Sequence, residues 1–200
     1  KGIQIVEKET DLLDKLQLTQ REALNSFGSD EIYIEKFLTS PRHVEIQIAA
    51  DSAGHVLHFF ERDCSIQRKN QKIIEEAPAF GIPEEKLEEI RQISVNTCEK
   101  LNYKGLGTFE FLYENGEFYF IEMNTRLQVE HTITEMITGI DLVKLQIKIA
   151  ADEEIRFTQE EINCRGHAIE CRINAEHSET FIPSPGLVTE FHPPGGFRIR

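Results

Sequence analysis

The sequence predicts an α+β fold of antiparallel strands flanked by helices. Two segments, roughly residues 11–27 and 84–102, carry apolar residues at helical spacing. Between and after them lie β-rich runs. Two pairs of these runs are joined by the turn sequences Asp51-Ser52-Ala53-Gly54 and Asn115-Gly116, which predict antiparallel hairpins.

The first 60 residues are predicted to contain one helix and three strands. Thr10 is expected to cap the helix over 11–27, and Gly28 to end it. Residues 32–37, 43–50 and 55–60 are β-rich and are read as strands. In the second helix, over 84–102, one stripe is expected to be buried, formed by Leu87, Ile90, Ser94, Cys98 and Leu101.

The turn at Asn115-Gly116 decides which face of its hairpin each side chain occupies. The flanking strands, 108–113 and 117–123, carry aromatic residues on both faces, which predicts a central ribbon covered on both sides. A two-residue turn would place Glu110 and Glu122 on opposite faces. We predict a three-residue loop, 114–116, with Gly116 left-handed at a bulge, which places both carboxylates on one face. A separation beyond about 8 Å would prevent them from sharing a cation.

The last third of the chain starts with a third helix. Thr138 and Asp141 are read as a capping box for a helix that runs to about Ala150. A short capped turn at 158–161 and a strand over 166–172 follow, and the Pro- and Gly-rich tail is read as short strands and turns. We expect a domain boundary between 151 and 165, which separates 1–155 from 156–200. The sequence is also expected to begin mid-protein and to end inside the second unit.

Composition limits the function. Among 200 residues, 35 Asp and Glu oppose 22 Lys and Arg, and this balance argues against a nucleic-acid or anionic-membrane partner. Four cysteines form no C-x-x-C pair, which favours reduced thiols in a cytosol-like compartment. No apolar run approaches the ~20 residues that span a bilayer.

Residues 122–131, EMNTRLQVEH, are the most informative stretch. In an extended segment alternate side chains share a face, which would gather Glu122, Asn124, Arg126, Gln128 and Glu130 on one side. Such a set can bind a metal cation at one end, and grip and deprotonate a small oxyanion at the other. The same alternation points His131 away from Glu130, which favours a supporting role for that histidine.

Residues 61–72, ERDCSIQRKNQK, form a second polar cluster, with four basic side chains at Arg62, Arg68, Lys69 and Lys72. They could bind phosphate or bicarbonate. On these residues alone, a solvated basic loop is the favoured interpretation.

Taken together, four motifs resemble the biotin carboxylase family of ATP-grasp enzymes: ERDCSIQRKNQK with the following EEAPA, GTFEFLYENGEFYFIEMN, EMNTRLQVEH, and GHAIECRINAE followed by FIPSPG. The resemblance covers essentially the whole chain. It implies an ATP-grasp fold over 1–155 and the start of a biotin carboxylase C-terminal domain over 156–200. It also implies an ATP-dependent ligase, in which bicarbonate attacks the γ-phosphate to give carboxyphosphate and carbon dioxide passes to carrier-bound biotin.

The resemblance also implies cofactors and partners. ATP is expected with Mg²⁺ or Mn²⁺, and biotin on a carboxyl carrier protein or domain. A carboxyltransferase component and a second copy of the chain are expected as partners, as in acetyl-CoA carboxylase of fatty acid biosynthesis. The expected location is cytoplasmic, or the mitochondrial matrix for a eukaryotic carboxylase.

Site residues follow from the resemblance motif by motif. The metal ligands would be Glu110 and Glu122, with Asn124 assisting. Bicarbonate would be held by Lys72, Arg126, Gln128 and the Val129 backbone, with Glu130 as the general base. Arg172 would stabilise the enolate of biotin. ATP would contact Glu35, Lys36, Leu38, His43, Gln67, Asn70 and Leu112.

Simpler interpretations stay open on the residues alone. Glu110 and Glu122 could face water at strand ends, Arg172 could pair with Glu170 or Glu176, and His43 could be an ordinary loop histidine. Two features depart from the family pattern: Asn70 stands where many members have histidine, and the Gly-rich phosphate loop is missing. We therefore expect the isolated 200 residues to show no turnover. Another ATP-grasp ligase, such as a carbamoyl phosphate synthetase relative, and a non-catalytic binding fragment are the alternatives.

Overall fold

The computed structural model describes residues 2–199 and divides the chain into two compact units, Lys1–Pro41 and Arg42–Arg200. The predicted boundary between 151 and 165 stays a prediction, and the division that the structure shows lies much earlier, after Pro41.

The first unit contains the predicted helix but not the predicted strand. A 3₁₀ turn, η1 (Glu9–Asp11), leads into α1 (Leu12–Phe27), which Gly28 ends in the left-handed region with φ 76°. Thr10 is not the cap: Asp11 occupies that position, without a capping bond from its side chain. The predicted strand over 32–37 is wrong, because within residues 2–41 this β-rich run has no strand to pair with.

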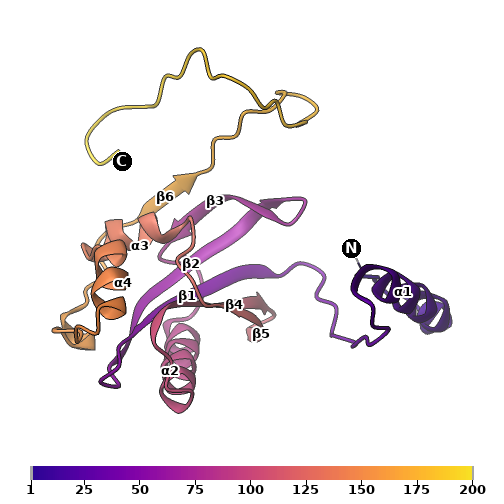
Figure 1. The fold of residues 1–200 in the computed structure, drawn as a ribbon, viewed down its shortest axis with the longest axis horizontal. Coiled ribbons are helices and arrows are strands. Elements are labelled where there is room, and N and C mark those ends of the chain that lie inside the picture. Colours follow the sequence, from indigo (N-terminus) through magenta and orange to yellow (C-terminus); the bar gives the residue numbers. More distant parts are fainter. Residues whose placement is uncertain (1, 200) are drawn as a thin grey trace. The chain divides into compact units, whose positions relative to one another are not determined.

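A six-stranded antiparallel sheet forms the body of the second unit, in the order β5-β4-β1-β2-β3-β6 (Figure 1). The strands are β1 (Arg42–Ala50), β2 (Val56–Arg68), β3 (Gln71–Ala77), β4 (Gly105–Glu114), β5 (Glu117–Asn124) and β6 (Ala168–Cys171). The predicted hairpins, 43–60 and 108–123, are therefore confirmed. Antiparallel strands and helices agree with the predicted α+β class.

The basic cluster is not a loop. β2 continues through it to Arg68, and β3 returns after a two-residue turn at Lys69 and Asn70, both with positive φ. This turn type suits a hairpin but usually contains glycine, so Lys69-Asn70 is not a recognisable turn signal. The solvated-loop interpretation was wrong, and the side chains of Arg62 and Lys72 belong to strands.

β1 separates a hydrophobic core from a polar face by simple alternation. Val44, Ile46 and Ile48 are fully buried and pack in one core with residues of β4 and with α2 (Glu84–Lys100). The residues between them, Glu45 and Gln47, are equally buried but project from the other face. The polar face of this strand later forms part of the site.

Helix α2 matches its predicted span and most of its predicted stripe. Leu87, Ile90, Ser94 and Cys98 are buried, but Leu101 lies after the end of the helix and is 66% exposed. A second core contains residues of β1 and β2 together with α4 (Leu142–Ala150), through the predicted Leu142, Leu145 and Ile149.

One helix was missed, and it changes the predicted capping. Helix α3 (His131–Thr138) begins directly after Glu130, and Thr138 is its last residue rather than part of a capping box. Asp141 alone caps α4, accepting a hydrogen bond from the Lys144 amide at 2.8 Å. The capping box at Thr158 and Glu161 is confirmed and opens the short η2 (Gln159–Glu161).

The β4–β5 hairpin has a different register from the predicted one. Glu114 pairs with Glu117 across a two-residue turn, in which Asn115 and Gly116 have φ 54° and 82°. The register then shifts by one residue opposite Ile121, so that Glu110 pairs directly with Glu122. The predicted positive φ at Gly116 and the shared face are confirmed, but the bulge lies within β5 rather than at the turn. β5 is also an edge strand and not a central one.

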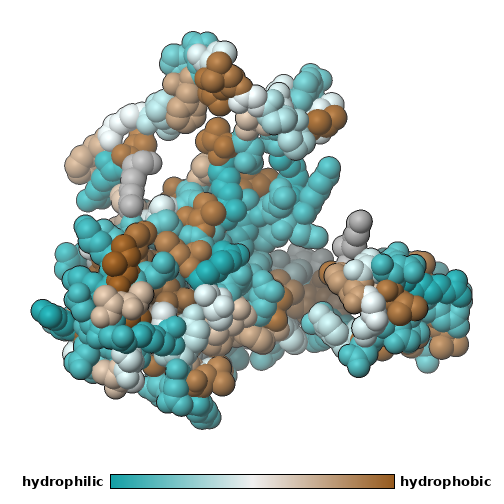
Figure 2. Space-filling view, viewed as in Figure 1, coloured by the Kyte–Doolittle hydropathy of each residue, from teal (hydrophilic) through white to brown (hydrophobic). Residues whose placement is uncertain are grey.

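Beyond β6 the tail contains one isolated bridge, Glu176 to Pro183, in place of the predicted short strands. Its apolar side chains are largely exposed, as the brown residues of the C-terminal segment show in Figure 2, with Leu187 at 90% and Phe197 at 91%. All four cysteines are free thiols, as predicted. Among the described residues, no helix has the length and apolar character needed to cross a membrane.

Candidate active site

A pocket of about 530 Å³ lies in the second unit and is lined by polar residues. It contains every residue predicted to bind the metal or bicarbonate, together with Arg172. Its lining is His43, Gln67, Asn70, Gln71, Lys72, Glu110, Glu122, Asn124, Arg126, Gln128, Val129, Glu130, Arg172 and Asn174.

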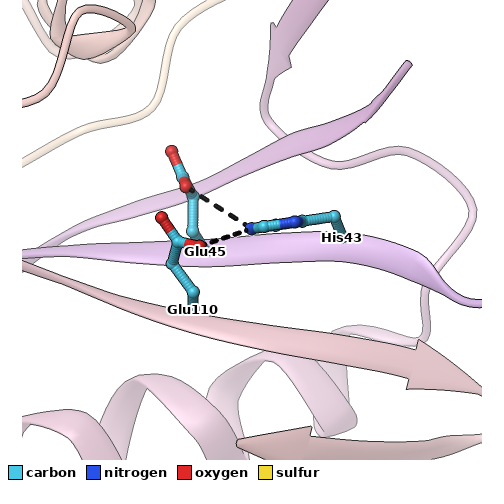
Figure 3. A group of neighbouring side chains, drawn as sticks. All are labelled: His43, Glu45 and Glu110. Atoms are coloured by element: carbon cyan, nitrogen blue, oxygen red, sulfur yellow. Dashed lines mark ion pairs between the residues drawn. The ribbon is translucent and has the colours of Figure 1, made fainter. Parts of the chain in front are cut away.

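Its floor comes from the polar face of β1 and from β4. Glu45 and Glu110 are directly paired across these strands, so their side chains share a face. His43 Nε2 lies 3.0 Å from Glu110 Oε2 and 3.9 Å from Glu45 Oε2 (Figure 3). Two carboxylates and an imidazole therefore meet at one point of the pocket.

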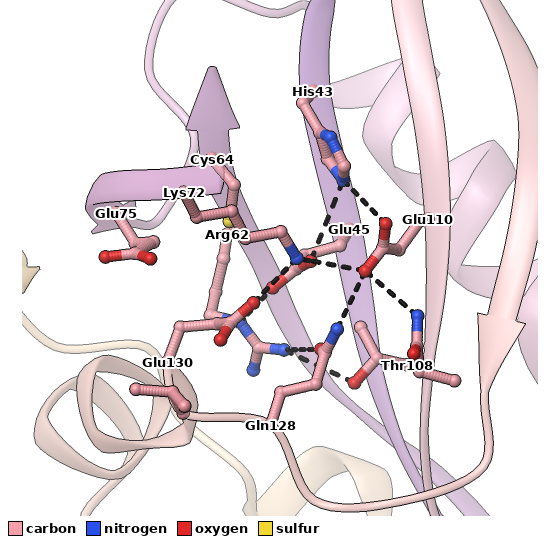
Figure 4. A network of polar contacts seen from close by, with 12 residues as sticks. His43, Glu45, Arg62, Cys64, Lys72, Glu75, Thr108, Glu110, Gln128 and Glu130 are labelled. Atoms are coloured by element: carbon pink, nitrogen blue, oxygen red, sulfur yellow. Dashed lines mark hydrogen bonds and ion pairs between the residues drawn. The ribbon is translucent and has the colours of Figure 1, made fainter. Parts of the chain in front are cut away.

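Lys72 joins three carboxylates at the centre of the pocket (Figure 4). Its ammonium donates to Glu45 Oε2 at 2.5 Å, Glu110 Oε1 at 2.9 Å and Glu130 Oε1 at 2.6 Å. Burial acts to lower the pKa of Lys72, but the carboxylates, Glu45 first among them, raise it above its ordinary value. Lys72 is therefore a fixed positive charge.

Glu110 is held ionised despite its burial. Burial acts to raise the pKa of Glu110, but the His43 ring and the Lys72 ammonium outweigh it and lower that pKa to about 2. An ionised carboxylate is the form that binds a hard divalent cation. Glu110 therefore offers the required ligand over the whole physiological pH range.

Glu122 and Asn124 complete a set of oxygen donors beside Glu110. The Asn124 amide donates to Glu110 Oε1 at 3.0 Å and to Glu122 Oε1 at 3.1 Å. Because both oxygens contact the same nitrogen, the carboxylates lie well within the limit of about 8 Å for a shared cation. Two carboxylates and an amide oxygen would suit Mg²⁺ or Mn²⁺. Asn124 Oδ1 here accepts from Arg126 Nη2 at 3.1 Å, so the amide would have to turn over to offer its oxygen to the cation.

Two further groups of candidate ligand atoms lie within 4.8 Å of one another: His43 with Glu45 and Glu110, and Glu45 with Cys64 and Glu130. Both include carboxylates that already bind the Lys72 ammonium. Glu110 accepts from the same ammonium, so these contacts do not decide between the groups, and the metal set of Glu110, Glu122 and Asn124 stays a prediction.

Glu130 lies at the N-terminus of α3, where the helix dipole favours a negative charge. It is 2% exposed and accepts from Lys72 at 2.6 Å and from Arg172 Nη2 at 2.8 Å. Burial acts to raise the pKa of Glu130, but Lys72 and then Arg62 lower it below its ordinary value. The predicted alternation of side chains over residues 122–130 does not reach Glu130, because the extended strand ends at Asn124. The loop and the start of α3 nevertheless direct Gln128 and Glu130 into the pocket.

Arg62 is a fully buried support beneath the pocket. Its guanidinium donates to Glu45 at 2.6 Å, to Gln47 at 2.8 Å and to Gln128 Oε1 at 3.0 Å. Gln128 in turn donates from Nε2 to Glu110 at 2.7 Å. Because the Gln128 oxygen faces Arg62 and its nitrogen faces Glu110, the orientation of this amide is fixed.

Arg172 contacts neither Glu170 nor Glu176, which the simpler interpretation required. It donates to Glu75 and Glu130, and Glu176 instead pairs with Arg68. His131 supports the loop before α3, with Nδ1 lying 2.8 Å from the Gln128 carbonyl oxygen, in agreement with its predicted role.

The residues predicted to contact ATP are only partly brought together. His43, Gln67 and Asn70 line the pocket, and Gln67 Nε2 lies 3.0 Å from His43 Nδ1. Leu112 pairs with His43 across β1 and β4 and so shares its face, but it does not line the pocket. The other three, Glu35, Lys36 and Leu38, lie in the first unit, and their role stays a prediction.

Sequence reasoning missed Glu45 and Glu75 as parts of the site, and it named Arg62 only as one of four basic side chains that could bind an anion, not as a buried support. Glu45 could have been found, because His43, Glu45 and Gln47 show the same two-residue spacing that singled out residues 122–130. Arg62 and Glu75 could not, because their sequence gave no sign of the hairpin that buries them.

Comparison with known proteins identifies relatives of this chain. Residues 1–158 match the family model "Carbamoyl-phosphate synthase L chain, ATP binding domain". The chain is 57% identical over 200 residues to a biotin carboxylase of Allochromatium vinosum and 56% identical to one of Haemophilus influenzae. All of this chain is covered in both comparisons, but only 44% and 45% of those relatives. The chain thus spans less than half of their length.

Solved structures give the same result. A biotin carboxylase from Campylobacter jejuni, in its β-γ-ATP complex, superposes with a TM-score of 0.91 at 46% identity. The biotin carboxylase domain dimer of Hydrogenobacter thermophilus 2-oxoglutarate carboxylase, with MgADP, ADP and bicarbonate, superposes with a TM-score of 0.90 at 45% identity. Each match covers 98% of this chain and 44% of the solved one.

Proposed function

Because this chain belongs to the family of the carbamoyl-phosphate synthase L chain ATP-binding domain, we propose that it carries the phosphoryl-transfer site of a biotin carboxylase. The reaction would be the ATP- and bicarbonate-dependent carboxylation of biotin on a carrier protein. The observation that carries this proposal is the contact of Lys72 and Arg172 with one buried carboxylate, Glu130, beside the Glu110–Glu122 pair.

Bicarbonate would bind between the cationic and the acidic side chains. Lys72 and Arg126 would bind its oxygens, and the Gln128 amide and the Val129 backbone would orient it. Glu130 would remove its proton. The positive charges lower the basicity of Glu130 in the absence of the anion, but a bound anion adds a negative neighbour and shifts the pKa of Glu130 upward. The close approach of Glu130 to the bound bicarbonate would supply the rest of the rate enhancement of proton removal.

ATP would enter at the other side of the pocket. The bound metal would neutralise phosphate charge where Glu110, Glu122 and Asn124 hold it. His43, Gln67 and Asn70, which line the pocket, would contact the nucleotide. Attack of a bicarbonate oxygen on the γ-phosphorus forms the P–O bond of carboxyphosphate and breaks the bond to ADP.

Carboxyphosphate would then release carbon dioxide and phosphate. The released phosphate would take the proton from the ureido nitrogen of biotin, and that nitrogen would attack carbon dioxide. Arg172, a permanent cation at the pocket wall, would stabilise the negative charge that develops on the ureido oxygen. We infer a carrier protein or domain, a carboxyltransferase and a second copy of the chain as partners, and the dimer of the 2-oxoglutarate carboxylase domain supports the last of these. A cytoplasmic location and a role in fatty acid biosynthesis are part of the same proposal.

The test uses a full-length protein that carries this chain. Biotin should stimulate bicarbonate-dependent ATP hydrolysis, and Arg172→Ala should abolish that stimulation while MgATP affinity stays within about twofold in calorimetry. A different ATP-grasp ligase, as the family description allows, would bind MgATP through the same Glu110 and Glu122 but would show no response to biotin. MgATP binding without a biotin response would therefore contradict the proposal.

A further inference from the structure

Arg172 is held between two buried carboxylates. Its Nε donates to Glu75 Oε1 at 2.6 Å, and its Nη2 donates to Glu130 Oε2 at 2.8 Å. The backbone is fixed as well, because the Arg172 amide donates to the Ile73 carbonyl at 2.9 Å. An arginine usually presents its Nε–Nη2 edge to both oxygens of one carboxylate. Here the edge is divided between two.

Dividing the edge leaves one buried oxygen without a partner. Glu75 is fully buried on β3, and its Oε2 makes no hydrogen bond to any residue that the structure describes. An unpaired oxygen of a buried carboxylate is unfavourable, and burial raises the pKa of Glu75 accordingly. An arrangement optimised only for stability would fill this acceptor.

We propose that Glu75 is a positioning residue for Arg172. It keeps hold of the guanidinium through Nε, and its free Oε2 accepts Nη2 when Glu130 takes up the bicarbonate proton. This inference rests on the proposed function, in which Glu130 is the base and Arg172 acts on biotin.

The change of partner follows from the charges. When the proton moves from the bicarbonate O–H to a Glu130 oxygen, Glu130 becomes neutral and its attraction for Arg172 falls. Glu75 keeps its charge, so Arg172 Nη2 turns from Glu130 to Glu75 Oε2. Arg172 Nε and Nη2 then both donate to Glu75. The Nη1 side of the guanidinium is then held in one orientation toward biotin. Proton removal from bicarbonate would thereby set up the biotin step.

The surrounding charges predict a second effect. Lys72, Arg62 and Arg172 act on Glu130, whereas Arg172, Glu170 and Glu130 act on Glu75. Glu170 is paired across the β3–β6 ladder with Glu75 and accepts from Thr132. Because Glu75 neutralises part of the Arg172 charge, its removal leaves Glu130 facing a stronger cation and lowers the pKa of Glu130.

The experiment compares Glu75→Gln, Glu75→Asp and the control Glu76→Gln in the full-length protein that carries this chain. Glu76 is the adjacent carboxylate on β3 but contacts His167 at the surface. For Glu75→Gln we expect biotin-dependent kcat to fall on the order of 10- to 100-fold, with MgATP affinity within about twofold. The acid limb of the pH profile for bicarbonate-dependent ATP hydrolysis should move down by roughly one unit. Glu75→Asp should keep the pH limb but lose rate, and Glu76→Gln should match the wild type.

Three results would overturn the proposal: a wild-type biotin-dependent rate in Glu75→Gln, an unmoved pH limb, or an equal loss of MgATP binding and turnover. If the wild-type protein shows no biotin response, the proposed function fails instead. A crystal structure of Glu130→Gln, which mimics the neutral form of Glu130, then still tests the change of partner: Arg172 Nη2 remaining on residue 130, with Glu75 Oε2 still unpaired, would disprove it.

Discussion

Glu110 and Glu130 share one lysine but face different tasks. Each accepts a hydrogen bond from the Lys72 ammonium, and each has its pKa held below the ordinary value by that contact among others. Glu110 benefits, because a metal ligand must stay ionised, whereas a base is weakened by the same effect. Lys72 therefore favours metal binding and limits proton transfer until an anion arrives.

Replacing Lys72 tests this balance. In Lys72→Met, burial remains while the ammonium is lost, so the pKa of Glu110 should rise from about 2. A metal binds the ionised form of Glu110. As the pH is lowered, the variant should therefore lose its Mg²⁺-dependent ATP affinity at a higher pH than the wild type does. Calorimetry over a pH series measures this. Lys69→Met, on the exposed turn of the same hairpin, is the matched control. Superposable pH curves for Lys72→Met and the wild type would contradict the argument.

Glu130→Gln removes the proposed base without changing its shape. Bicarbonate-dependent ATP hydrolysis should fall by about 10²- to 10⁴-fold, the usual contribution of a positioned base, while MgATP binding is retained. Steady-state kinetics with calorimetry on the same sample would show this. The exposed Glu153→Gln should be neutral. A Glu130→Gln protein that keeps more than a tenth of the activity would exclude Glu130 as the base.

At the scale of elements, the β4–β5 hairpin shows how far a sequence pattern can lead. Asn115-Gly116 correctly predicts a tight turn. The prediction that Glu110 and Glu122 share a face, as binding of one cation needs, is also correct. The pattern does not say where the extra residue lies. A bulge at the turn and a bulge at Ile121 both place Glu110 and Glu122 on the same face.

Deleting Ile121 distinguishes the two registers. In the observed register Ile121 is the extra residue, so its deletion restores a regular ladder and leaves Glu122 paired with Glu110. With the bulge at the turn, the same deletion would move Glu122 to the opposite face. We expect Mg²⁺-dependent ATP binding to be retained within about tenfold, measured by calorimetry with Ile121→Ala as the control that keeps the bulge. Loss of the metal dependence in the deletion variant alone would favour the turn register.

Other elements show why prediction succeeded or failed. Helices α2 and α4 were found because each has an apolar stripe that is buried in a core. The strand over 32–37 failed because β-propensity alone provides no hydrogen-bond partner. α3 was missed because its short sequence follows directly on a strand-like alternation. The metal and bicarbonate residues were located through the family resemblance, while their buried supports depend on long-range pairing that no local pattern contains.

At the scale of the whole molecule, an acidic chain offers anions a pocket in which three cationic side chains balance three carboxylates. The net charge is −13, yet Lys72, Arg126 and Arg172 line one pocket. At low ionic strength the net negative charge is weakly screened, so it would slow the approach of ATP or bicarbonate from a distance. The attraction of these anions to the cations inside the pocket would stay strong.

A buried histidine away from the pocket predicts a pH dependence of stability. Burial, with a contribution from Arg91, lowers the pKa of His58 from 6.5 to about 4. Above pH 6.5 both folded and unfolded chains leave His58 neutral. As the pH falls, the unfolded chain binds the proton first, so stability decreases by up to roughly 3 kcal/mol between pH 6.5 and 4. His58→Leu should flatten this part of the curve in pH-dependent thermal unfolding, whereas the exposed His192→Leu should not. Parallel curves for wild type and His58→Leu would contradict it.

The alternation along β1 has a consequence for folding and for selection. Since one residue of slip would exchange Val44, Ile46 and Ile48 with Glu45 and Gln47, a chain cannot bury its core in the wrong register and still be stable. A correctly packed core therefore implies a correctly oriented site: any molecule that buries the apolar face of β1 also directs Glu45 toward the pocket. Selection for thermal stability in variants of β1 should therefore retain competent sites, without any assay of activity.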